Sequence, residues 1–162
     1  MQSGSALLDA LQEGSFAVAM RDSIWLYPVV ETVHIIGFSV LVGAVIMFDL
    51  RVLGVSKRVP VRMLAHHLLP WSLAALLLIV PAGFLMFSAD ATNLISNRAF
   101  IIKMVLLLLA ATNATTFHMG AIREVEQWDQ GTTAPRSARL HAAASLLIWL
   151  GVVTCGRMIA YV

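Results

Sequence analysis

Four long stretches of the chain contain no charged residue, and they predict its architecture. Lys, Arg, Asp and Glu are absent from residues 32–48, 63–89, 104–122 and 140–156. Each stretch spans roughly 17 residues or more, which with its flanks is enough for a helix to cross a bilayer. Lipid offers no hydrogen-bond partners to an open strand, so helices are the expected element. We predict an all-α integral membrane four-helix bundle, one domain over residues 1–162, with spans at about 23–53, 66–88, 97–120 and 137–161.

Residues at the ends and inside these stretches support helices. Ser23 and Asn97 suit the N-caps of the first and third spans, and Pro135 precedes the fourth. Pro70 and Pro81 lie inside the second span, where we expect them to kink the helix.

Two further groups of residues, glycines of the first span and polar residues of the third, bear on how the spans pack. Gly37 and Gly43 of the first span are expected at a close-packed face. The third span is polar near its end, where we expect interhelical hydrogen bonds from Thr112, Asn113, Thr115 and Thr116.

The segment before the first span has a different pattern. In residues 5–20, apolar Leu7, Leu11 and Phe16 alternate with polar Asp9 and Glu13. An apolar face opposite a charged face is typical of a helix that lies on a membrane surface. The sequence therefore predicts a short N-terminal interfacial helix.

Composition agrees with a membrane protein. Of the 162 residues, 59% are hydrophobic and 12% are charged, about half the charge of an average soluble domain. The net charge is only +2, and the basic residues form no stripe of the kind that binds nucleic acid. Cys155 is the only cysteine, which excludes an intrachain disulfide and the Cys-x-x-Cys-His motif of covalent haem attachment.

The basic residues are distributed unequally between the two sides of the predicted bundle. Seven lie on the side of the first and third connections: Arg51, Lys57, Arg58, Arg62, Arg123, Arg136 and Arg139. The other side has Arg21, Arg98, Lys103 and Arg157. Cytoplasmic loops carry the excess of basic residues in membrane proteins. We predict a multi-pass protein of the bacterial inner membrane with both termini in the periplasm.

Four ionisable residues lie in the predicted outer half of the bundle. Glu31 and His34 share a face of the first span because they are three residues apart. Lys103 and Arg157 lie near the outer ends of the third and fourth spans. A buried charge in lipid costs several kcal/mol unless it is paired or hydrated. One interpretation is a structural ion pair of Glu31 with Arg157 or Lys103, and the other is a site for protons or a quinone.

Four of the five histidines lie near the opposite, inner face. His66 and His67 begin the second span, His118 ends the third and His141 begins the fourth. Haem b needs two imidazoles at one depth on facing helices. We expect the second and third spans to be antiparallel neighbours, so His67 with His118 is the first choice, with His66 and His141 as substitutes. A metal site formed by Asp49, His67 and His118 is an alternative. Histidines at a membrane boundary also simply contact lipid headgroups.

Several stretches carry a resemblance to a known family. They are "ETVHIIGFSVLVGAVIMFDLRVLG" (31–54), "HLLPW" (67–71), "NATTFH" (113–118) and "GRMIAY" (156–161). Over residues 24 to 161 the chain resembles a bacterial four-helix inner-membrane family catalogued as a domain of unknown function. The resemblance implies the four-helix fold and a location in the inner membrane, but it implies no activity. It includes Glu31, His34, Asp49, Arg51, His67, His118 and Arg157 in its motifs. The architecture alone is similar to small b-type cytochromes, which pair histidines at two depths.

Three classes of function follow. The first is electron transfer, with one haem b near the inner face and a quinone or a redox partner protein near Glu31 and His34. The second is a non-enzymatic membrane subunit, or a protein that handles a small solute or a metal ion, with a structural network of ion pairs. A homo-oligomer is compatible with either. An intramembrane metal hydrolase is a third, smaller class.

Overall fold

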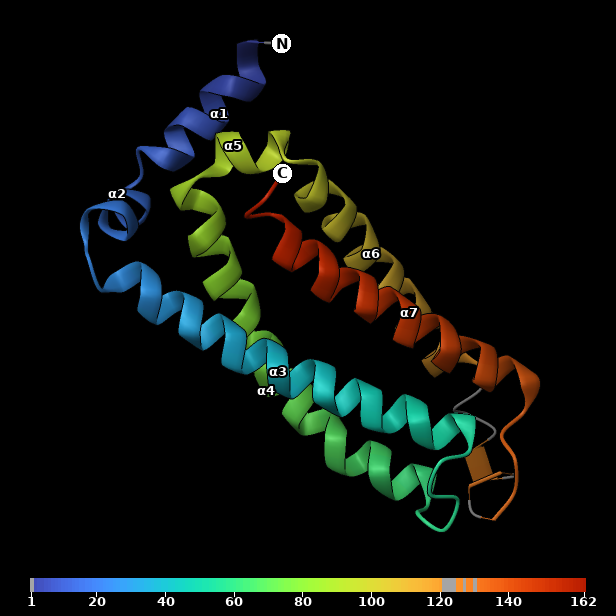
Figure 1. Ribbon diagram of the computed structural model, residues 1–162. Coiled ribbons are helices and arrows are strands. Elements are labelled where there is room, and N and C mark those ends of the chain that lie inside the picture. The colour runs from blue at the N-terminus through green and yellow to red at the C-terminus, as the bar shows by residue number, and fades with distance from the viewer. Residues whose placement is uncertain (1, 121–124, 127, 130) are drawn as a thin grey trace.

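The computed structural model describes residues 2–120, 125–126, 128–129 and 131–162, and their regular structure is helical (Figure 1). The helices are α1 (Gln2–Gln12), α2 (Ser15–Asp22), α3 (Leu26–Leu53), α4 (Val61–Ala89), α5 (Ala91–Ser96), α6 (Arg98–Met119) and α7 (Arg136–Met158). Four of them, α3, α4, α6 and α7, are long and apolar enough to cross a membrane. The predicted all-α fold with four spans is confirmed.

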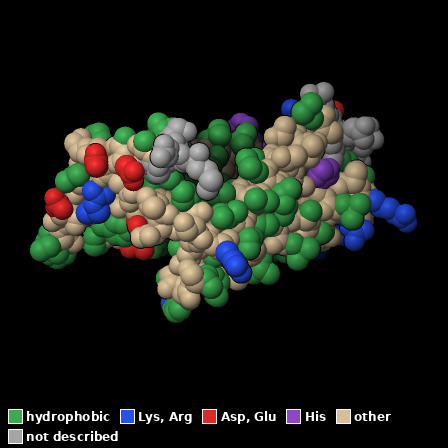
Figure 2. Space-filling model, turned by 90° about the horizontal axis from the view of Figure 1, so that it is seen from above, with side chains coloured by type: hydrophobic (Ala, Val, Ile, Leu, Met, Phe, Trp, Pro, Cys, Tyr) green, Lys and Arg blue, Asp and Glu red, His purple; other side chains and the backbone are tan. Residues whose placement is uncertain are grey.

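The two ends of the bundle differ. Both chain termini, α1, α2 and α5 lie at one end, which we name the terminus end (Figure 1). The connections between α3 and α4 and between α6 and α7 lie at the other, which we name the loop end. Figure 2 shows the molecule from above along its length, with acidic side chains gathered toward the end where α1 and α2 lie. Hydrophobic side chains cover much of the face between this part and the basic side chains at the opposite extremity. This distribution fits a bundle that spans a bilayer lengthwise.

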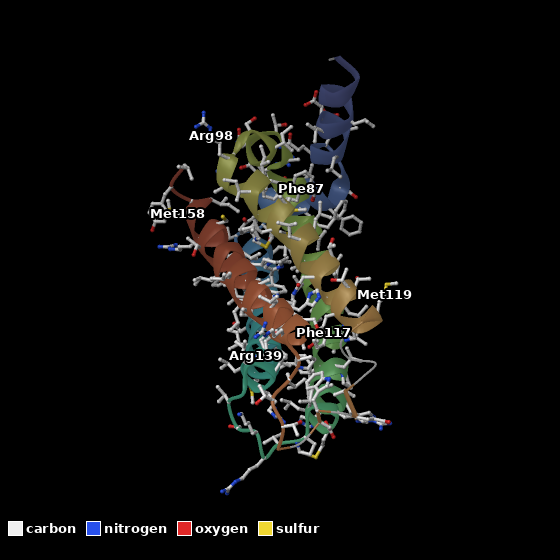
Figure 3. The ribbon with its side chains drawn as sticks, turned by 90° about the vertical axis from the view of Figure 1, so that its right-hand side faces the viewer. Phe87, Arg98, Phe117, Met119, Arg139 and Met158 are labelled. Atoms are coloured by element: carbon white, nitrogen blue, oxygen red, sulfur yellow. The ribbon has the colours of Figure 1, made fainter. Side chains whose placement is uncertain are left out.

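The spanning helices pack in the order α4, α3, α7, α6. Helix α3 is central, with α4 against one side and α7 against the other, and α6 packs mainly on α7. Figure 3 shows the antiparallel α6–α7 pair, with Arg98 and Met158 toward the terminus end and Met119 and Arg139 toward the loop end. Helices α4 and α6 lie apart along most of their length, but Phe87 and Phe100 stack between them at the terminus end with 5.6 Å between the ring centroids. The expectation that the second and third spans are neighbours therefore holds at the terminus end and not beside His67 and His118.

Small residues permit the close contacts. A Cβ on Gly37 of α3 would lie 3.0 Å from Cγ1 of Ile79 on α4, so this glycine lets the two helices approach. A Cβ on Gly151 of α7 would lie 2.9 Å from Leu106 of α6, with the same consequence for that pair. Gly43 has open space where its Cβ would be, so only Gly37 of the two predicted glycines serves packing.

The N-terminal segment forms two helices instead of the predicted single one. The chain turns between α1 and α2, and α2 packs across the end of α4. Ala17 and Met20 of α2 are buried in that contact, with 1% and 2% of their surface exposed, whereas Phe16 is exposed. A helix that buries one face in the protein and leaves an apolar side chain such as Phe16 exposed is suited to a membrane surface, where that side chain can contact lipid.

Both connections at the loop end are joined by one side chain. Arg51, in the last turn of α3, is buried. Its guanidinium donates to three backbone carbonyl oxygens, those of Lys57 (3.2 Å), Val59, and Asp129 (2.9 Å). The Asp129 carboxylate in turn accepts from the backbone N–H of Arg62 at 2.8 Å. This cap explains why α4 begins at Val61, five residues before the predicted start.

Candidate functional site

His34 lies in the terminus half of α3 and points toward α4. Its Nδ1 is 3.0 Å from the carbonyl oxygen of Ile79, and its ring stacks on Phe38 with 6.5 Å between the centroids. A Cβ on Gly83 would approach the ring to 3.1 Å, so the glycine makes room for the imidazole. Pro81 lies between these two α4 residues and has no N–H, so this turn of α4 has one backbone hydrogen bond fewer.

Lys103 of α6 lies at about the same depth in the bundle as His34. Its side chain is half-buried, and the Nζ would lie 3.8 Å from a Cβ on Gly156 of α7. Lys103 and His34 are within electrostatic range of one another, as are Glu31 and His34. The structure thus brings three of the four predicted outer residues into one region.

The predicted ion pair of Glu31 is not formed. Among the described residues the salt bridge found is Arg62–Glu126, at 3.1 Å on the exposed surface of the loop end. Arg157 instead donates to the Tyr161 hydroxyl, and its guanidinium lies 4.9 Å from the centroid of that ring. Arg157 faces outward at the end of α7, where a long side chain reaches the polar boundary of the membrane. Its pairing with Glu31 was the wrong expectation, because α3 and α7 contact each other closer to the loop end (Figure 1).

An aromatic contact lies on the loop side of His34. Phe38 of α3 and Trp149 of α7 are 6.1 Å apart between ring centroids, with their planes tilted by 57°. We name this pair the aromatic layer. It places two large apolar rings between the outer polar residues and the polar residues nearer the loop end.

The first ionisable residue of α3 on the loop side of the layer is Asp49. It lies 18 residues after Glu31, which is five helical turns, so both carboxylates occupy one face of α3. Only 5% of Asp49 is exposed. The side chain of Ser145 on α7 lies beside the Asp49 carboxylate, and Oδ2 of Asp49 is buried with no hydrogen-bond partner. A buried carboxylate oxygen without a donor is unusual in a native protein and indicates a functional role or an unseen partner.

His141 and Asn113 join α7 to α6 by two hydrogen bonds. The Nδ1 of His141 lies 2.8 Å from Oδ1 of Asn113, and Nδ2 of Asn113 donates to the His141 carbonyl at 3.1 Å. The prediction that Asn113 bonds between helices is confirmed. Its threonine neighbours instead bond within α6, each to a carbonyl of the preceding turn, as Thr112, Thr115 and Thr116 show.

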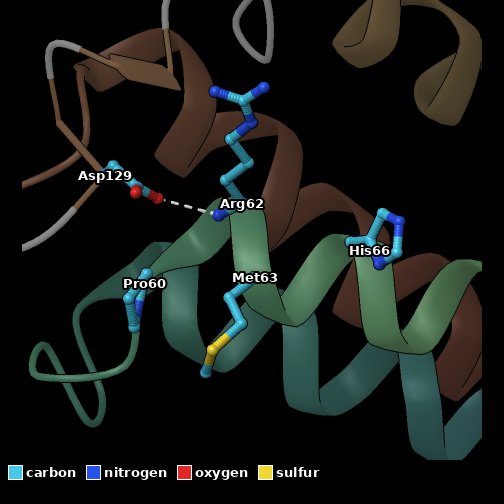
Figure 4. A pocket seen from close by; sticks show the side chains of 5 residues that line it. All are labelled: Pro60, Arg62, Met63, His66 and Asp129. Carbon is cyan, nitrogen blue, oxygen red and sulfur yellow. Dashed lines mark hydrogen bonds between the residues drawn. The ribbon is translucent and has the colours of Figure 1, made fainter.

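The remaining histidines do not converge. His118 is exposed, with Nδ1 2.8 Å from the Ala114 carbonyl of its own helix. His66 borders a hollow of 390 Å³ at the loop end, one turn after Arg62 (Figure 4). His67 is exposed on α4, whose stacking contact with the helix of His118, Phe87 on Phe100, lies at the terminus end and far along the chain from both histidines. No group of three or more His, Cys, Asp or Glu side chains suited to a metal occurs within the described part of the chain. Haem b and a metal ion stay predictions of the sequence.

The family assignment follows from the extent of the match. A model for a family of unknown function, DUF6644, matches residues 23–162. The chain belongs to the DUF6644 family. The predicted resemblance to a catalogued domain of unknown function is thereby confirmed. Neither a curated protein nor a solved structure matches the chain.

The DUF6644 match begins at Ser23 and includes the four spans but not α1 and α2. The polar residues of the spans, from Glu31 to Arg157, therefore all lie within the family region. Sequence patterns did not predict the aromatic layer or the burial of Arg51. The first depends on which helix faces α3 and the second on how the two connections fold over its end, and the spacing of residues along one helix shows neither.

Proposed function

We propose that this DUF6644 protein passes protons across the membrane through the bundle interior alongside α3. The observation that carries the proposal is Asp49, a buried carboxylate whose Oδ2 has no hydrogen-bond partner. Ionisable groups inside a membrane are costly and commonly mark ion or proton pathways. A carboxyl group with one oxygen that no donor satisfies can take up and release a proton there.

Two groups of protonatable side chains support a pathway. On the terminus side of the aromatic layer, Glu31 and His34 interact electrostatically, and imidazole exchanges protons near neutral pH. On the loop side lie Asp49 and the His141–Asn113 pair. We expect protons to enter one group and leave from the other.

The aromatic layer is the barrier between the groups. His34 and Asp49 are about 22 Å apart along α3, at a rise of 1.5 Å per residue. Phe38 and Trp149 lie between them. Passage of a proton requires these rings to separate and water to enter, so the arrangement described here is the closed state of the proposed pathway.

The proposal is tested in proteoliposomes that contain a pH-sensitive dye, with an imposed potassium diffusion potential. Trp149→Ala removes one ring of the barrier and should raise proton entry several-fold over the wild-type protein. Adding Asp49→Asn should abolish the increase, because the amide neither takes up nor releases a proton. Trp25→Ala is the matched control, since Trp25 is 76% exposed at the terminus end, away from the layer.

Retention of an entrapped dye distinguishes a proton pathway from a damaged bundle. The dye should stay inside vesicles of all four proteins. The proposed pathway is wrong if protons enter vesicles of Trp149→Ala no faster than vesicles of the wild type. It is also wrong if adding Asp49→Asn leaves the increased rate of proton entry unchanged.

Electron transfer through haem b or a quinone is the competing function, and the gathering of four histidines toward the loop end favours it. It rests on the sequence pattern alone. The absorption spectrum of protein purified from its native membrane decides between the two. A Soret band that His118→Ala removes would favour electron transfer over the proton pathway.

We also propose the bacterial inner membrane as the location, with the terminus end in the periplasm. The excess of basic residues at the loop end supports this orientation.

A further inference from the structure

A second site lies away from the bundle interior, where α2 turns into α3. Here the structure has a surface hollow of 470 Å³, a size typical of small-ligand sites. Its polar lining includes Arg21, Tyr27 and Asp90, and its apolar lining includes Met20, Ile24 and Pro28. Because these residues come from α2, from the start of α3 and from the end of α4, the hollow depends on the docking of α2.

The charges in the hollow are of both signs. Arg21 supplies a guanidinium, which is positioned by bonds to the carbonyls of Ala89 (3.3 Å) and Gln12 (2.6 Å) and is still exposed. Asp90 supplies a carboxylate whose Oδ1 accepts from Asn93 at 2.7 Å and which has acceptor positions left. Glu31 and Asp90 both lie within electrostatic range of the Tyr27 phenol. A ligand that carries a cation and an anion therefore fits better than one that carries an anion alone.

The position of the hollow indicates a ligand from the membrane itself. It lies at the first turn of the first spanning helix, where the polar terminus end meets the apolar part of the bundle. The adjacent Ile24 and Trp25 are among the most exposed large apolar residues of the chain. Exposed Trp and aliphatic side chains at such a boundary contact the headgroup region of a bilayer.

We propose that this hollow binds the headgroup of a phospholipid with a primary amine, of the phosphoethanolamine type. The phosphate contacts Arg21, because guanidinium groups form strong charge-assisted bonds with phosphate. The ammonium contacts the Asp90 carboxylate and the face of the Tyr27 ring, a combination that favours organic cations. The acyl chains run along the apolar surface of α3. A headgroup with glycerol in place of the amine keeps the phosphate contact but has no cation for Asp90.

Native mass spectrometry of the full chain in detergent tests the proposal, with phosphatidylethanolamine and phosphatidylglycerol of identical acyl chains as probes. The wild-type protein should retain one phosphatidylethanolamine with about tenfold preference, the effect of one bond between charged groups. Asp90→Asn should reduce that preference to near unity. Arg21→Gln should weaken the binding of both lipids, and Arg21→Lys should retain part of that binding. Asp9→Asn is the matched control and should change nothing, because Asp9 lies exposed on α1 away from the hollow.

Circular dichroism spectra of the variants must match the wild type, because Arg21 also holds α1 and α4 together. Equal retention of the two lipids by the wild type overturns the proposal, as does an unchanged preference in Asp90→Asn. Soluble phosphoethanolamine separates a lipid from a free solute. If it displaces the lipid at equal concentration, the acyl chains contribute nothing and the assignment to a membrane lipid is wrong.

Discussion

The Nδ1 of His34 on α3 lies 3.0 Å from the carbonyl oxygen of Ile79 on α4. A carbonyl oxygen only accepts hydrogen bonds, so Nδ1 carries the hydrogen in this contact. Nε2 is then left for a second partner. The same imidazole thus links two spans and keeps one nitrogen for the proton exchange that we propose. A structural role and a functional role are compatible in this residue.

His34→Ala should lower the free energy of unfolding by about 2 kcal/mol, because it removes one hydrogen bond and the ring that stacks on Phe38. Titration with a denaturing detergent, followed by circular dichroism, measures the change. Ser39→Ala is the control. Its hydroxyl is exposed and bonds to Ile35 of its own helix, so the effect should stay below about 0.5 kcal/mol.

Gly83→Ala tests the contact between the His34 ring and α4 by changing the α4 residue. The new methyl group would meet the His34 ring at 3.1 Å, so we expect destabilisation in the wild-type protein. In the His34→Ala background the ring is gone and the cost should be smaller. Additive effects of the two substitutions would contradict the contact between these positions.

Arg51→Gln should destabilise the protein by about 3 kcal/mol or more. Three carbonyl oxygens lose a charged donor, and bonds to charged groups contribute about 1.5–3 kcal/mol each. Both connections should then open, which limited proteolysis would show as cleavage within residues 54–60. Arg139→Gln changes an exposed arginine at the same end, and its cleavage pattern should equal that of the wild type. Protection of the connections in Arg51→Gln would show that they fold without this side chain.

Asn113→Ala should weaken the α6–α7 pair by about 1–2 kcal/mol, because it removes both hydrogen bonds to His141. Thr112→Val provides the comparison at the neighbouring position. The Thr112 hydroxyl bonds within α6, so its loss should have little effect on the packing of the pair. Equal unfolding free energies for the two variants would argue against the Asn113–His141 link.

Labelling of single cysteines in intact cells tests the orientation. In a Cys155→Ala background, a membrane-impermeant maleimide should react with Ile95→Cys at the terminus end and spare Val55→Cys at the loop end. Both positions are exposed, so accessibility of the side chain does not bias the result. Lysed cells should label both. The opposite pattern in intact cells would place the terminus end in the cytoplasm.

The local features of this fold followed from the sequence. The absence of charge over four long stretches was sufficient to predict four spanning helices, since a helix satisfies its own backbone in lipid. The cap at Asn97 was predicted in the same way, because its side chain accepts from Phe100 only three residues later. Such interactions lie within one turn of the chain, and residue type alone indicates them.

The order in which the helices pack could not be predicted from the residue types within each span. In lipid the apolar faces of all four spans are nearly equivalent, so packing shape and a few polar contacts select the neighbours. Gly37 admits α4, and the Asn113–His141 bonds select α6 as the neighbour of α7. The arrangement that results separates His67 from His118 and buries Asp49 against Ser145. Contacts between residues a hundred positions apart depend on this three-dimensional fit, and the periodicity of one helix carries no information about them.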